Sequence, residues 1–167
     1  MAPERSDLVS LVDSPSNFLE AEDPILRRMA VTALITDEAL HHRRRLEQLA
    51  TDGDSAIRTA VAEKLGSVGS EALPTLEILR TDQIGTVREA TATAYGEVAD
   101  PVAIDWLMEA SAGDEDRAVR EAAVASLGAI GDQRAIDHLL TLLREGPPQV
   151  RRRTVAALTV FDDERIE

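Results

Sequence analysis

The sequence has no cysteine and few aromatic residues, and each shortage excludes a class of structure or chemistry. Without cysteine there is no disulfide, no thiolate nucleophile and no cysteine-ligated zinc, which suits a reducing compartment. Aromatic residues make up 2% of the chain, so Leu, Ile, Val and Ala must fill the core, as closely packed helices allow. The 9 glycines and 7 prolines are too few for the many turns of an all-β meander. We therefore expect an all-α protein.

Basic residues are scarce relative to acidic ones. The chain has 18 Lys and Arg against 31 Asp and Glu, for a formal net charge of −13. This charge repels polyanions, so nucleic acid and anionic membranes are poor partners. No segment approaches the roughly 18 apolar residues of a membrane span, and the opening residues lack the apolar run of a signal peptide. We expect a cytoplasmic protein that binds no membrane.

An apolar residue followed by arginine recurs along the chain. The arginines are Arg27, Arg58, Arg88, Arg120 and Arg151, with spacings of 31, 30, 32 and 31 residues. The second residue after the arginine is alanine in the three inner copies, and the eighth is glycine. A period that persists over five copies predicts a repeat architecture.

Each copy contains two predicted helices. In the segment after Arg117, the apolar residues Val119, Ala123 and Leu127 lie on one helical stripe. A second segment, 135–143, aligns with equivalent segments of the two preceding copies. Each unit is therefore predicted to form a helical hairpin.

Two kinds of position have an expected structural role. Asp23, Asp54 and Asp116 lie four residues before an arginine, where each can cap the helix and pair with that arginine one turn on. The small residues Ala90 and Ala122 are expected to be buried between neighbouring units, where helices press together.

The succession of Asp, Val-Arg, Ala and Leu-Gly resembles the HEAT repeat, most closely the short HEAT-like units of the phycobilisome lyase type. The resemblance covers about residues 24–161 and implies an α-α superhelix, a solenoid of about five helical hairpins. It places the arginine helix second in each hairpin, on the concave side, and the first helix of the first hairpin within 6–22. We treat 1–167 as a single domain of five units centred on the five arginines.

The two end copies depart from the inner ones. The alanine position becomes Met29 in the first copy and Arg153 in the last, and the glycine position becomes Ile35 and Thr159. Terminal repeats of a solenoid are atypical because one side meets solvent. We expect Arg153 to be exposed. Either the array ends here or the chain is part of a longer array, and the atypical last copy favours the first alternative.

No group of residues indicates catalysis, a cofactor or a metal. His41 and His42 are expected on different sides of one helix, and His138 lies on another first helix about 30 Å away. The His-Glu pairs of the HEAT-repeat di-iron hydroxylases do not occur. We predict a protein that is not an enzyme, without catalytic, metal-binding or cofactor-binding residues.

Two arginine triplets, 43–45 and 151–153, suggest two interpretations. They could contact phosphates, which makes nucleic-acid binding one alternative function. They could instead form charged helix faces paired with nearby Glu47, Glu145 or Asp162, which the acidic composition of the chain favours.

Trp106 is the only tryptophan, and the equivalent positions of neighbouring units hold Thr75 and His138. An exposed Trp106 would be an anchor for a partner, because tryptophan is enriched at interface hot spots. A half-buried Trp106 would serve packing between first helices. Both interpretations remain open.

The positions one and five residues after the repeated arginine are neighbours on the helix surface and lie off the apolar stripe. Stacked side by side, they predict a ridge on the concave face that is acidic in the middle and basic at one end. The predicted partner-binding residues are Thr59, Glu63, Glu89, Thr93, Glu121, Ala125, Arg152 and Ala156.

The leading hypothesis is a scaffold or adaptor that binds a partner protein on this concave face. The partner is expected to present a basic or amphipathic segment. One alternative, from the family resemblance, is a subunit or helper of a bilin-lyase-like enzyme. The other is nucleic-acid binding through the arginine triplets.

Overall fold

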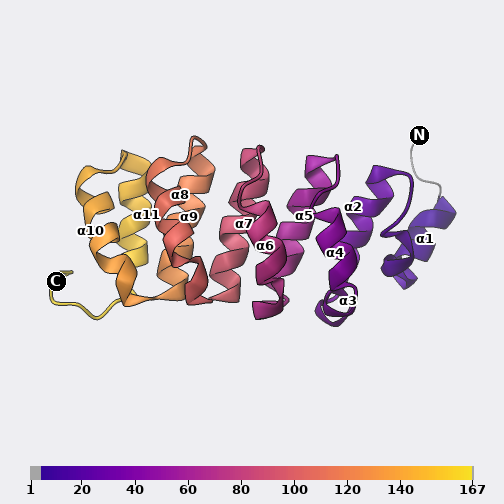
Figure 1. The fold of residues 1–167 in the computed structure, drawn as a ribbon, viewed down its shortest axis with the longest axis horizontal. Helices are drawn as coiled ribbons and strands as arrows, with labels where there is room; N and C mark the ends of the chain where they lie inside the picture. The colour runs from indigo at the N-terminus through magenta and orange to yellow at the C-terminus, as the bar shows by residue number, and fades with distance from the viewer. Residues whose placement is uncertain (1–4, 167) are drawn as a thin grey trace.

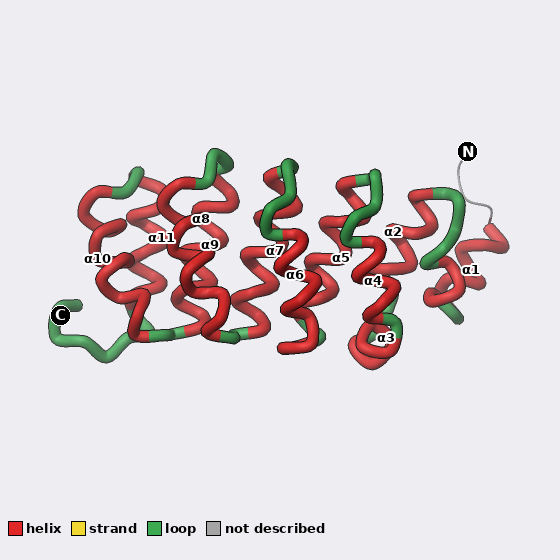
Figure 2. The backbone as a smooth tube through the Cα atoms, viewed as in Figure 1, coloured by secondary structure: helices red, strands yellow, loops and turns green. Residues whose placement is uncertain are grey.

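The computed structural model describes residues 5–166, and within this range the chain forms helices joined by short loops, with no strand (Figure 2). The helices stack side by side along one axis, and α1 (Arg5–Asp13) and α11 (Pro148–Leu158) lie toward opposite ends of the stack (Figure 1). The predicted all-α solenoid is confirmed.

The helices form five successive hairpins. The first helices are α1, the pair α3 (Thr36–His41) and α4 (Arg43–Leu49), α6 (Leu73–Leu79), α8 (Ile104–Gly113) and α10 (Ile136–Glu145). The second helices are α2 (Pro24–Ala33), α5 (Ser55–Gly66), α7 (Gly85–Val98), α9 (Arg117–Ile130) and α11. Short 3-10 helices follow α1 and precede α6, α8 and α10: η1 (Pro15–Phe18), η2 (Gly69–Ala72), η3 (Pro101–Ala103) and η4 (Gln133–Ala135). The repeated arginines all lie on second helices, as predicted.

The first helix of the second hairpin is broken, which the sequence did not predict. The backbone of His42, with φ −96° and ψ 18°, leaves the helical region, so α3 ends at His41 and α4 begins at Arg43. The two histidines therefore do not lie on opposite sides of one continuous helix. Their rings instead meet edge to face, with centroids 5.0 Å apart.

The second helices pack directly on one another along the stack, from α2 through α5, α7 and α9 to α11, whereas neighbouring first helices touch only sparsely. Between the two rows lies a continuous core of aliphatic side chains, to which the position seven residues after each arginine contributes a buried residue. We call the surface formed by α2, α5, α7, α9 and α11 the inner face.

Glycines, rather than alanines, make the closest contacts between second helices. A Cβ atom on Gly128 would lie 2.8 Å from the Cα atom and 2.9 Å from the Cβ atom of Ala157. Ala60 is buried, but Ala90 and Ala122 are only half-buried, so their predicted burial was wrong. Those two positions lie at the surface edge of the helix contact, while the glycine position lies at its closest point.

We expect Gly128→Ala to lower the free energy of unfolding by about 1–3 kcal/mol through overpacking against α11. The loss should appear although alanine favours a helix by about 1 kcal/mol over glycine. Gly113→Ala, where nothing lies within 4 Å of the added Cβ atom, is the matched control and should lose nothing. Urea unfolding measures both, and equal midpoints would contradict the assigned close contact.

The repeated arginines connect consecutive hairpins. Each of three arginines donates from Nε and Nη2 to an aspartate in the loop of the next hairpin: Arg27 to Asp52, Arg58 to Asp82 and Arg88 to Asp114. In the middle pair the Nε–Oδ2 and Nη2–Oδ1 distances are 2.6 and 3.0 Å. We call these three pairs the Asp–Arg ladder.

The predicted caps are confirmed, but their predicted ion pairs were wrong. Asp23, Asp54 and Asp116 each accept from the backbone N–H two residues on, at 2.8 to 2.9 Å. The arginine one turn later does not pair with its cap, because Arg27 and Arg58 extend sideways to a ladder aspartate and Arg120 donates to backbone carbonyls. Its Nη1 also donates to the carbonyl six residues earlier, as Arg58 does to Asp52 at 2.7 Å.

The ladder ends at Arg120. Gly146 lies 26 residues after Arg120, as Asp114 does after Arg88, and has no carboxylate to accept. Arg120 Nη1 donates to the carbonyls of Asp114 and Glu115, while its buried Nε has no partner in the described part of the chain. The last hairpin is therefore joined to the array by packing rather than by a ladder pair.

Candidate functional site

The predicted partner-binding residues all lie on the inner face, at least partly open to solvent, and all eight line grooves between second helices. Thr59, Glu63, Glu89 and Thr93 share one groove, and Glu121, Arg152 and Ala156 share another. Ala125 lies in a groove that adjoins the second one at Ala156.

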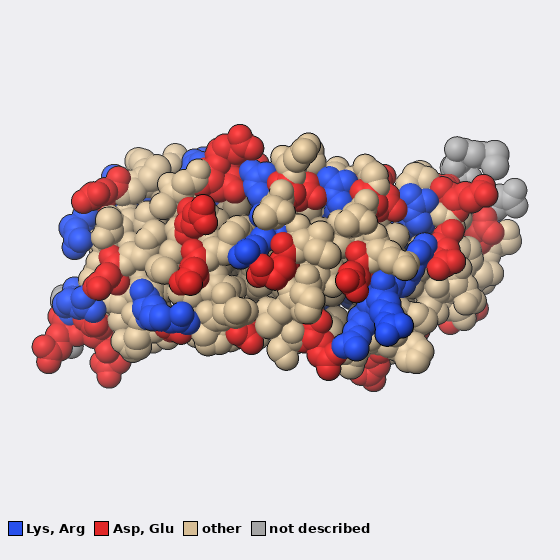
Figure 3. Space-filling view, in the orientation of Figure 1, with Lys and Arg blue, Asp and Glu red and all other residues tan. Residues whose placement is uncertain are grey.

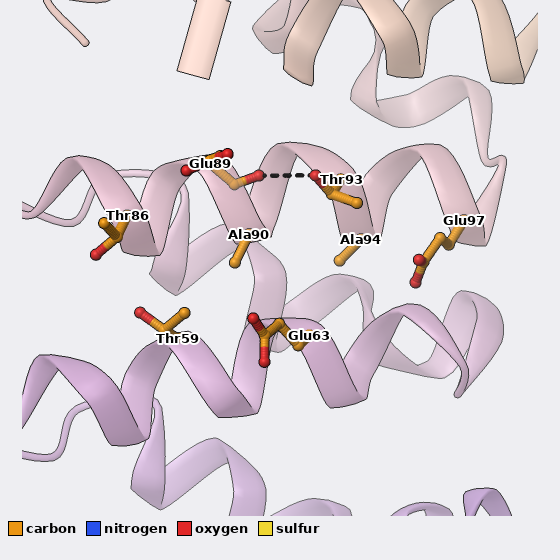
Figure 4. A pocket seen from close by; sticks show the side chains of 8 residues that line it. All are labelled: Thr59, Glu63, Thr86, Glu89, Ala90, Thr93, Ala94 and Glu97. Atoms are coloured by element: carbon orange, nitrogen blue, oxygen red, sulfur yellow. Dashed lines mark hydrogen bonds between the residues drawn. The ribbon is translucent and has the colours of Figure 1, made fainter. Parts of the chain in front are cut away.

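The first of these grooves lies between α5 and α7 and has a volume of about 380 Å³. Thr59 and Glu63 project from α5 toward the side chains that α7 contributes (Figure 4). Those α7 residues are Thr86, Glu89, Ala90, Thr93, Ala94 and Glu97. No described lysine or arginine lines the groove, so we call it the acidic groove.

The three carboxylates of the acidic groove are available to a ligand. Glu63 and Glu97 are exposed and Glu89 is half-buried, and none of them takes part in an ion pair within residues 5–166. Thr93 Oγ1 donates to the backbone carbonyl of Glu89 at 3.1 Å, which leaves the Glu89 carboxylate free of that contact (Figure 4). Alanines at positions 90 and 94 form the floor, so the carboxylates stand over a shallow apolar strip.

A second depression, between α2 and α5, continues the acidic groove toward the start of the chain. It shares Thr59, Glu63 and Thr86 with the acidic groove, and Arg28 lines its far side. A ligand in the acidic groove could therefore extend across three successive second helices.

The groove between α9 and α11 has the opposite charge. Arg117, Arg152 and Arg153 line it together with Glu121, Gln149 and Ala156, around a volume of about 270 Å³. Arg117 Nε donates to Glu121 Oε1 at 2.6 Å, so the Glu121 carboxylate is already paired. We call this the basic groove. The predicted basic end of the inner face thus exists, but Glu121 belongs to it rather than to the acidic middle.

The arginine triplets behave differently from one another. Arg43 pairs with Glu71 of the next hairpin, and Arg45 pairs with Glu20 of the preceding one. Basic side chains gather around α4 on the face formed by the first helices (Figure 3). Arg151 Nη1 donates to the carbonyl of Gly146 at 3.0 Å, whereas Arg152 and Arg153 are exposed in the basic groove.

The partners expected for the triplets were wrong. None of Glu47, Glu145 and Asp162 pairs with a triplet arginine within the described residues. The two triplet arginines that do pair, Arg43 and Arg45, reach carboxylates of the adjacent hairpins, 28 and 25 residues away in sequence.

Trp106 packs on the core from α8. Its ring centroid lies 5.5 Å from that of the buried Tyr95, and the tryptophan is half-buried. Tyr95 Oη donates to Glu77 at 2.9 Å, and burial together with this carboxylate raises the pKa of the tyrosine. These contacts favour the packing interpretation of Trp106. Because the tryptophan is only half-buried, the anchor hypothesis is still open to experiment.

His138, on α10, lies apart from the adjacent pair His41 and His42. His138 is half-buried with Nε2 2.7 Å from Ser111 Oγ, and burial lowers the pKa of its imidazole. Within residues 5–166, no group of three or more His, Cys, Asp or Glu side chains could hold a metal ion. In the same range no helix is long and apolar enough to cross a membrane.

Among the groove residues that the sequence did not single out, two are charged, Glu97 and Arg117. Glu97 lies nine residues after Arg88, one turn beyond Thr93 on the same face, and Arg117 lies three residues before Arg120. Considering one further helical turn in each direction would have found both.

The helical hairpins, stacked with their second helices in contact and with grooves between them, define an α-solenoid with a grooved inner face. Two overlapping segments, residues 12–96 and 74–159, match the family model of HEAT repeats. The chain belongs to the HEAT-repeat family. A search of curated proteins gave no match to the chain.

Proposed function

We propose that the protein is a scaffold or adaptor that binds a basic or amphipathic segment of a partner protein on its inner face. HEAT repeats are commonly protein-interaction scaffolds, which supports the general role. The particular surface consists of the eight predicted residues with Glu97 added.

The acidic groove is the observation that carries this proposal. Three carboxylates that have no ion-pair partner among the described residues surround a strip of alanine and threonine in a groove of about 380 Å³. Lysine or arginine side chains would be attracted to the carboxylates, and their aliphatic parts would pack on the alanines. The net charge of −13 adds long-range attraction for a basic partner.

We expect the triple variant Glu63→Lys, Glu89→Lys and Glu97→Lys to fold normally and to bind a lysine-rich amphipathic peptide about tenfold more weakly, or worse. The side chains are at least partly solvated, so their replacement leaves the core intact. Fluorescence anisotropy with a labelled synthetic peptide measures the affinity, and wild-type binding should weaken as salt rises past the screening range.

A matched variant separates position from net charge. Glu47, Glu109 and Glu145 are exposed on first helices, and replacing all three with lysine changes the net charge equally. This control should retain the peptide. Equal weakening in both variants would show that the acidic groove has no special role and would reject the proposal.

The two alternatives make different predictions. Nucleic-acid binding through the arginine triplets predicts that wild type binds a DNA duplex at low salt and that the inner triple variant binds it better. A role as a subunit or helper of a bilin-lyase-like enzyme rests on the resemblance of the repeats, and no side chain in the grooves supports it in particular. We also propose a cytoplasmic location, supported by the cysteine-free composition.

A further inference from the structure

Two grooves of opposite charge lie on the same face of the molecule. The acidic groove presents Glu63, Glu89 and Glu97, and the basic groove presents Arg152 and Arg153 beside the Arg117–Glu121 pair. The residues one and five positions after the repeated arginine contribute to both grooves, and these positions are equivalent on parallel second helices. A segment laid across the inner face would therefore meet both grooves.

Two of the three arginines that line the basic groove are not neutralised within the described part of the chain. Arg152 and Arg153 are exposed, and within residues 5–166 neither has an ion-pair partner. In a chain with 31 acidic residues against 18 basic ones, two such arginines beside each other stand out against the general charge. Their positive charge complements a carboxylate of a binding partner.

We propose that the inner face binds one extended partner segment with charges of both signs, its basic residues over the acidic groove and its acidic residues over the basic groove. This inference rests on the proposed function and adds the position and direction of the segment. The opposite placement would set lysines against Arg152 and Arg153 and carboxylates against Glu63, Glu89 and Glu97, so the charges fix one orientation.

The spacing between the grooves sets the spacing of the charges. The grooves are separated by two steps along the row of second helices, or about 20 Å at the usual 9–10 Å between packed helices. An extended chain covers about 3.3 Å per residue, so the basic and acidic groups of the partner are centred about six residues apart.

Three synthetic peptides test the proposal on the whole chain. One has a lysine block and a glutamate block centred about six residues apart, the second has serines in place of the glutamates, and the third has serines in place of the lysines. We expect the two-sign peptide to bind wild type about tenfold more tightly than the lysine-only peptide, and the glutamate-only peptide to bind weakest.

Arg152→Glu, with Arg144→Glu as its control, locates the effect. Arg144 is exposed on α10, away from both grooves, and its replacement changes the net charge equally. Arg152→Glu should reduce the two-sign peptide to the affinity of the lysine-only peptide or below, whereas Arg144→Glu should preserve the difference. Both arginines are solvated, so thermal melting of the variants should match wild type.

The orientation of the bound peptide can be measured with a spin label at a single introduced cysteine, because the chain has no cysteine of its own. A nitroxide attached at Ala156→Cys should broaden the NMR signals of the glutamate block more than those of the lysine block.

Each failure has a distinct meaning. Equal binding of the two-sign and lysine-only peptides would overturn this inference and leave the proposed function standing. Equal effects of Arg152→Glu and Arg144→Glu, or stronger broadening of the lysine block, would also overturn it. If neither lysine-containing peptide binds wild type, both this inference and the proposed function are wrong.

Discussion

Asp82→Ala should lower the free energy of unfolding by about 2 kcal/mol. The Asp82 carboxylate is 10% exposed and accepts from Arg58 Nε and Nη2 and from the backbone N–H of Ile84. Its removal leaves the guanidinium of Arg58, 15% exposed, without its bidentate partner. Chemical denaturation in urea measures the loss.

Asp137→Ala is the control for this variant. Asp137 pairs with Arg165, but its side chain is 84% exposed, and exposed ion pairs contribute little. The urea midpoint of this control should remain close to that of wild type. If Asp82→Ala were no more harmful than Asp137→Ala, the Asp–Arg ladder would not be what holds consecutive hairpins together.

Acidification should destabilise the fold through the same ladder. Burial raises the pKa of Asp52, Asp82 and Asp114, but hydrogen bonds from arginine and backbone N–H groups more than offset this, so each pKa lies below its usual range. A carboxyl whose pKa is depressed in the folded state stabilises it above the unfolded-state pKa of about 3.9. That stabilisation disappears as the pH falls through the folded-state values.

Urea midpoints measured at neutral pH and at successive steps below about pH 4 test this linkage. The free energy of unfolding should fall steeply over this range in wild type. It should fall less in Asp82→Ala, because one of the linked carboxyl groups has been removed. Equal slopes for the two proteins would contradict the assignment of the depressed pKa to Asp82.

The architecture was predictable because the residues that recur in each repeat are residues that the core requires. Leu65 and Leu127, seven residues after their arginines, are buried as the period requires. The helix break at His42 was not predictable, because no proline or glycine marks it, and α3 and α4 each contact α5 on their own side of the break.

The role of the repeated arginine was misread for a physical reason. Sequence spacing suggested an ion pair with the cap one helical turn away, whereas the observed partner lies 24 to 26 residues on, in the loop of the next hairpin. The aspartates at 52, 82 and 114 recur with nearly the same period as the arginines, and that recurrence was the available signal.

The grooves were predictable in outline and not in detail. Helical spacing placed Thr59 beside Glu63 and Glu89 beside Thr93, because residues four apart lie on the same side of a helix, and the repeat placed the two pairs at equivalent positions of α5 and α7. It could not show that Glu121 would be paired with Arg117, since that depends on rotamers, or that α5 and α7 would be far enough apart to leave a groove.

Amide chemical-shift mapping with the lysine-rich peptide tests the central claim, that the inner face is the binding surface, most directly. We expect the largest shift changes on α5 and α7, around Glu63 and Thr93, with smaller changes on α6 and α8. The opposite distribution, with the largest changes around Trp106 on the face of the first helices, would contradict the claim and would favour the tryptophan as the anchor.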